Sequence, residues 1–153
     1  MNFDSYWKIL VHRVYRGGEV LTGPEETVYR LTCIYGETMV DGIESYFERR
    51  FSEYEKDMVL LADSGFGDIA ADFSEAKNLM FGMAPLSESV VMPVIDRLLD
   101  EKHEDRAILD ALGAVYDRLI ARLPRVLVYR DTYARERQLY EEAEPGGSTR
   151  TPR

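Results

Sequence analysis

Apolar residues recur at helical spacing along almost the whole of this 153-residue chain. The clearest stretch extends from residue 104 to residue 123, where apolar side chains return every three or four positions: Leu109, Leu112, Tyr116, Leu119 and Leu123. Such spacing places these side chains on one face of an α-helix. The sequence therefore predicts an all-α protein, a single compact bundle of seven or eight helices over residues 1–143.

Capping and helix-breaking residues predict the limits of the helices. Gly17 and Gly18 end a first helix, and Asp41 and Gly42 break a second one that begins near Thr22. Further helices are expected over about residues 43–50, 52–64, 68–81, 91–99, 104–123 and 124–142, with a loop at 83–88. Residues 126–129 (Val-Leu-Val-Tyr) are β-prone and leave a short strand open as an alternative. Residues 144–153 contain no large apolar side chain and are expected to form a disordered tail.

The composition is that of a globular protein, with 45% hydrophobic residues and a single cysteine, Cys33. A lone cysteine cannot form an intramolecular disulfide and is typical of a reducing compartment. The first residues have no signal-peptide pattern, and no apolar run approaches the ~18 residues that a membrane span needs. We therefore expect a cytoplasmic protein with no membrane partner.

Charge is distributed unevenly along the chain. Residues 19–117 hold 22 acidic and 8 basic residues, a balance of −14, whereas residues 1–18 and 118–153 carry +2 and +3. Clustered charge creates a stronger local field than the overall −9 suggests. An acidic middle segment repels nucleic acid and favours a basic protein partner.

No catalytic or cofactor-binding motif accompanies this charge. The chain lacks phosphate-binding loops and the GxSxG nucleophile motif. His12, Cys33 and His103 are the remaining nitrogen and sulfur candidates, and no two of them have the spacing of metal ligands. We therefore expect neither a cofactor, a metal nor catalytic residues, with an enzyme that uses a carboxylate site as the third-ranked alternative.

Carboxylates form two rows at helical spacing. The first row is Glu37, Asp41, Glu44 and Glu48, and the second is Asp68, Asp72 and Glu75. On a helix each row follows one face, with carboxylates ~6 Å apart, which is close to the spacing of phosphates along a nucleic-acid strand. Two interpretations stay open: ordinary solvated helix faces, or a surface that binds a basic partner.

Residues 25–82 resemble the helical domain shared by bacterial DNA-mimic proteins and many uncharacterised relatives. The resemblance depends on the break at residues 40–43 (Val-Asp-Gly-Ile), the aromatic helix at 44–47 (Glu-Ser-Tyr-Phe), and the pairs at 61–62, 65–66 and 69–70. The chain departs from the family pattern at Asp41, where a glycine is expected, and at Arg49 and Arg50. The resemblance implies an all-helical domain without catalytic residues, whose carboxylates imitate DNA and block a DNA-binding protein.

The leading hypothesis is a non-enzymatic acidic module that binds a basic protein, with a DNA-binding regulator as one candidate. The partner-binding residues would be the seven carboxylates of the two rows, which should then lie on the same side of the molecule. The alternative is an immunity or antitoxin protein that neutralises one toxin, since tight inhibitor pairs use steering charges. Exposed tyrosines leave a homodimer open as well.

Overall fold

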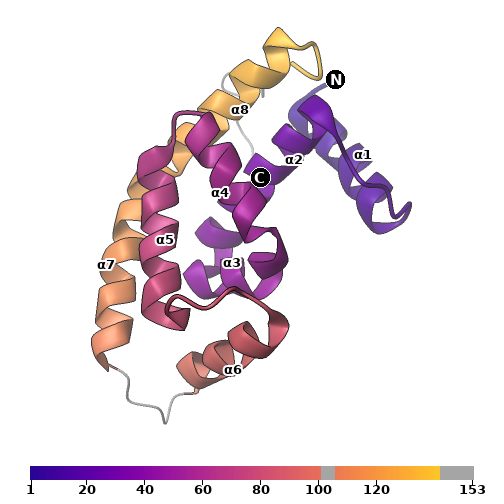
Figure 1. Ribbon diagram of the computed structural model, residues 1–153. Helices are drawn as coiled ribbons and strands as arrows, with labels where there is room; N and C mark the ends of the chain where they lie inside the picture. The colour runs from indigo at the N-terminus through magenta and orange to yellow at the C-terminus, as the bar shows by residue number, and fades with distance from the viewer. Residues whose placement is uncertain (101–105, 142–153) are drawn as a thin grey trace. The chain divides into compact units, whose positions relative to one another are not determined.

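The computed structural model describes residues 1–100 and 106–141, and all regular secondary structure among these residues is helical. Figure 1 shows the helices in chain order. The prediction of an all-α fold is confirmed. The predicted disordered tail at 144–153 lies outside the described residues, as does the expected start of the helix at 104.

The chain divides into two compact units, whereas the sequence predicts one bundle. The first unit contains residues 1–33 and 125–153, and the second contains residues 34–124. The division passes through one long helix, α2 (Gly23–Asp41). Periodicity identifies the apolar face of each helix but not which faces meet, so it could not reveal this division.

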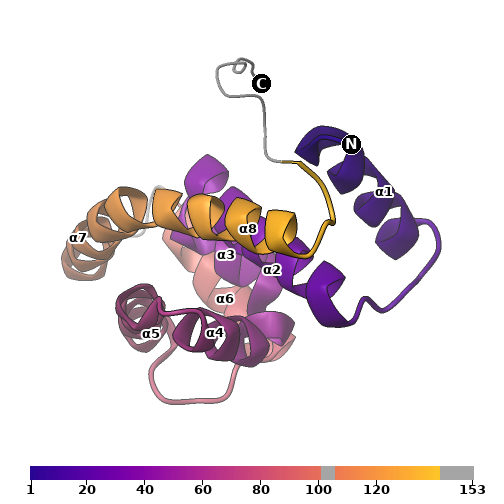
Figure 2. The ribbon, with the colours of Figure 1, turned by 90° about the horizontal axis from the view of Figure 1, so that it is seen from above.

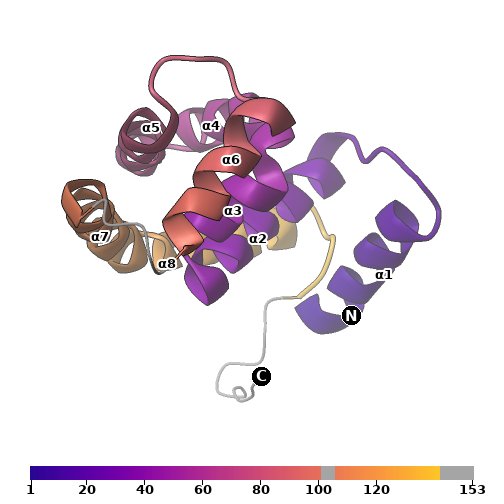
Figure 3. The same ribbon diagram turned by 90° about the horizontal axis from the view of Figure 1, so that it is seen from below.

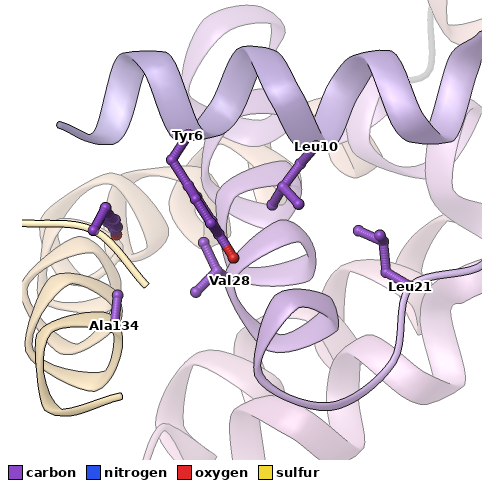
Figure 4. Close-up of a cluster of buried hydrophobic side chains, with 6 residues drawn as sticks. Tyr6, Leu10, Leu21, Val28 and Ala134 are labelled. Atoms are coloured by element: carbon purple, nitrogen blue, oxygen red, sulfur yellow. The ribbon is translucent and has the colours of Figure 1, made fainter. Parts of the chain in front are cut away.

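The first unit packs α1 (Phe3–Tyr15) and α8 (Pro124–Glu136) around the first half of α2. In Figure 4, Tyr6 and Leu10 of α1 point toward Val28 of α2, with Leu21 and Ala134 on either side. Tyr140 completes this cluster of buried side chains. Here the burial of apolar side chains joins α1 to α8.

The second unit contains the end of α2 and five further helices with one short 3-10 turn. Their bounds are α3 (Ile43–Arg50), η1 (Phe51–Glu53), α4 (Tyr54–Asp63), α5 (Gly67–Phe81), α6 (Glu88–Leu99) and α7 (Arg106–Arg122). Figure 2 views α5 nearly along its axis and shows α4 and α7 beside it. Seen from below in Figure 3, α6 covers α3.

Aromatic rings fill the centre of the second unit. Tyr46, Phe47 and Phe73 are fully buried, and the rings of Tyr46 and Phe73 lie 4.6 Å apart. The Tyr46 hydroxyl donates a hydrogen bond of 2.7 Å to Asp57 Oδ2. Arg50 donates two further hydrogen bonds of 2.8 Å to the same buried carboxylate. Burial and the neighbouring Asp57 raise the pKa of Tyr46 well above its ordinary value.

Two details of the helix prediction need correction. The β-prone residues 126–129 lie inside α8, so the alternative of a short strand is wrong. Pro124 is the first residue of that helix, and the side chain of Val126 is buried. Such tertiary burial outweighs a weak strand propensity. The helix at the end of the chain also stops at Glu136 rather than near residue 142.

Gly42 separates α2 from α3 through a backbone conformation that other residues rarely adopt. Its φ is 93° and its ψ is −179°, a combination that is populated essentially by glycine alone.

We expect Gly42→Ala to lower the free energy of unfolding by about 1–3 kcal/mol. Denaturant titration measures this loss. Gly67→Ala is the control, because Gly67 has no positive φ and a Cβ there meets open space. A loss no larger than that of Gly67→Ala would contradict the assigned role of Gly42.

Candidate protein-binding site

The second acidic row is engaged inside the second unit. Asp72, which is 4% exposed, accepts hydrogen bonds from Arg118 Nε at 3.0 Å and Arg122 Nη1 at 2.7 Å. Arg118 Nη2 also donates to Glu75 Oε1 at 2.5 Å, and Arg122 Nε lies 3.8 Å from Asp68 Oδ2. The row therefore faces α7 and joins it to α5, and its charges are largely compensated there.

This pairing shows why the charge pattern along the sequence differs from the charge that the folded second unit leaves uncompensated. Arg118 and Arg122 were counted with the basic end of the chain, 46 and 50 residues after Asp72. Folding brings them onto the acidic segment. The sequence does contain one indication of this pairing. The two arginines are four positions apart on one helix, and Asp68 and Asp72 have the same spacing on another. The hydrogen bond to Asp72 raises the pKa of Arg118 above its ordinary value.

The first row is less engaged. Glu37 accepts a hydrogen bond from Ser45 Oγ at 3.2 Å and lies 3.6 Å from Arg49 Nη1. Asp41, Glu44 and Glu48 form no ion pair within residues 1–100 and 106–141. Because Gly42 breaks the helix, Asp41 ends α2 while Glu44 lies in the first turn of α3.

Asp41 and Glu44 line an open groove of about 540 Å³ in the second unit. We call it the acidic groove, and its lining comes from the junction of α2 and α3 and from α7: Val40, Asp41, Gly42, Ile43, Glu44, Leu109, Leu112, Gly113 and Tyr116. Ile43 and Leu112 are buried beneath it, whereas Val40 is 77% exposed. Its volume lies in the range of about 300–1,000 Å³ that is typical of ligand sites. The acidic groove thus combines carboxylates with apolar side chains.

The position of Asp41 is unfavourable for the isolated protein. It occupies the last position of α2, a helix that has no basic residue in its last turn. A negative charge at the carboxyl end of a helix opposes the helix dipole and costs about 0.3–1 kcal/mol. Glu44 has the opposite placement, because the first turn of a helix favours a carboxylate. The stability of the fold therefore does not account for Asp41.

A second groove, of about 600 Å³, lies between α4 and α5. Met58, Val59 and Met83 give it an apolar lining, and Glu55 and Lys77 contribute one charge of each sign. It therefore has no charge preference for a partner. None of the seven predicted carboxylates lines it.

Neither Cys33 nor His12, the described residues considered for catalysis, is part of the lining of a groove. Cys33 is half-buried and His12 is exposed. In the part of the chain that the structure describes, no three histidine, cysteine or acidic side chains are placed to hold a metal ion. His103 lies outside that part. No helix in residues 1–100 and 106–141 is both long enough and apolar enough to cross a bilayer.

The chain matches no known protein family, curated protein or solved structure. The resemblance to the DNA-mimic family therefore stays a prediction.

Proposed function

We propose that this protein is a non-enzymatic binding module whose acidic groove captures a basic, amphipathic segment of a partner protein. One observation carries the proposal: two carboxylates that form no ion pair within the described residues, Asp41 and Glu44, stand over an open apolar groove. On such a segment, cations would meet the carboxylates, and apolar side chains would cover the exposed Val40 and the half-buried Leu109 and Tyr116.

The two kinds of contact contribute differently. Solvent-exposed ion pairs stabilise a complex by about 0.2–1 kcal/mol each, while burial of apolar surface contributes about 25 cal/mol per Å². Both kinds of contact would therefore contribute to the affinity. The carboxylates would accelerate association and select against acidic partners. The overall charge of −9 also attracts basic partners and repels acidic ones.

The proposal is narrower than imitation of DNA. A DNA mimic needs rows of free carboxylates, and Asp68, Asp72 and Glu75 form ion pairs with arginines of α7. We therefore propose only part of the first row as the partner-binding surface, with Asp41 and Glu44 in contact with the partner. Glu48 would add to the field from the exposed surface of α3.

Neutralising the two groove carboxylates should weaken binding without unfolding the protein. The probe is a fluorescein-labelled peptide of lysine, leucine and alanine, about 18 residues long so that it can form a helix. We expect the double variant Asp41→Asn, Glu44→Gln to bind it about tenfold more weakly in an anisotropy titration, a loss of about 1.4 kcal/mol. The wild-type affinity should also fall as salt is added.

Asp63 and Asp96 provide the matched control. Both are exposed, belong to the second unit and form no ion pair among the described residues. Asp63→Asn with Asp96→Asn changes the net charge by the same amount but leaves the acidic groove intact, so the affinity should be unchanged. An equal loss in both double variants would mean that only overall charge matters, and the proposed site would be wrong.

A further inference from the structure

Gly113 lies in the interior of α7 and lines the acidic groove. Glycine in the middle of a helix is less stable than alanine. A Cβ built at Gly113 meets no atom within 4 Å. Packing within the described residues therefore does not require glycine at this position.

Gly113 has no side chain, so it leaves a gap between its larger neighbours on α7, which we call the notch. Leu109, Leu112, Gly113 and Tyr116 follow the spacing of one helix face, and all four line the groove. Leu109 and Tyr116 are half-buried, and they stand one turn before and about one turn after Gly113. A helix axis can approach another more closely where the side chains at the contact are small.

Resting on the function proposed above, we propose that the occupant of the acidic groove is a basic amphipathic α-helix whose backbone crosses α7 at Gly113. Its cationic side chains meet Asp41 and Glu44, which supply the complementary charge. Its apolar face covers Val40, Leu109, Tyr116 and the notch.

A helix fits this site better than an extended segment. An extended peptide gains most of its affinity by adding to the edge of a β-sheet, and residues 1–100 and 106–141 contain no strand. A helix satisfies its own backbone hydrogen bonds. It also presents cations and apolar residues on separate faces at intervals of three and four residues. These properties match a groove between helices with carboxylates on its rim.

Substitution of Gly113 should move stability and binding in opposite directions. Gly113→Ala is expected to raise the melting temperature by about 2–4 °C, because alanine favours the helix. The same variant should bind the lysine–leucine–alanine peptide about tenfold more weakly, since the methyl group fills the notch. Gly36→Ala is the matched control: Gly36 is inside α2, a Cβ there also meets nothing within 4 Å, and it does not line the groove. It should raise the melting temperature without changing the affinity.

A second experiment tests whether the bound peptide is helical. A peptide of the same composition with a central proline cannot form a continuous helix, and it should lose binding. Equal affinity for both peptides, or an unchanged affinity in Gly113→Ala, would overturn this inference. If Asp41→Asn with Glu44→Gln still weakened binding in that case, the proposed function would stand. If none of these variants weakened binding, both proposals would fail.

Discussion

Replacement of Asp57 by alanine is expected to lower the free energy of unfolding by about 3–5 kcal/mol. Asp57 is fully buried and accepts hydrogen bonds from Arg50 and from the Tyr46 hydroxyl. Loss of the carboxylate leaves the buried Arg50 guanidinium without its main counter-charge, which is the costly way to break such a pair. Denaturant unfolding followed by circular dichroism measures the effect.

The double variant Arg50→Met, Asp57→Leu tests whether the loss of stability comes from a buried charge without its partner. Because neither charge remains to be compensated, we expect the double variant to recover much of the stability that Asp57→Ala loses. A double variant that is as unstable as the single one would mean that shape or the buried Tyr46 hydroxyl left without its acceptor, rather than charge, determines the loss. Such a result would contradict the role assigned to the ion pair.

Asp72→Ala is expected to cost about 3 kcal/mol of stability. Hydrogen bonds to charged groups contribute about 1.5–3 kcal/mol each, and Asp72 accepts two from Arg118 and Arg122. The partly exposed arginines can regain water in the variant, which places the expected loss at the low end of the sum. Denaturant titration at pH 7 provides the measurement.

Glu48→Ala is the reference for this prediction. Glu48 belongs to the first acidic row, is exposed and forms no ion pair among the described residues, so its removal should change stability by less than about 0.5 kcal/mol. If Asp72→Ala were as mild as Glu48→Ala, Asp72 would not hold α5 against α7.

Local features of the fold could be predicted from the sequence because they depend on neighbouring residues. The break at Gly42 and the apolar stripe of residues 109–123 both follow from spacing and from the properties of glycine. The pairing of Asp72 with Arg118 could not be predicted in this way, because it joins residues 46 positions apart. The acidic groove was missed for the same reason, since Leu109 and Gly113 meet Val40 and Asp41 only in the folded second unit.

Two residues of the acidic groove lower the stability of the free protein. Asp41 opposes the dipole of α2, and Gly113 weakens α7. Neither has a compensating contact described above, and both face the same groove. Residues that favour binding at the expense of stability are a common property of functional sites. The account therefore predicts that optimising this groove for stability removes its capacity to bind.

The most direct test maps where the basic amphipathic peptide binds, by following backbone amide chemical shifts during a titration with nuclear magnetic resonance. We expect the largest changes in the segments 40–44 and 109–116, which contribute the lining of the acidic groove. Asp68, Asp72 and Glu75 should change little, because their carboxylates already pair with α7. Changes concentrated on those three residues, or spread evenly over the acidic surface, would contradict the account.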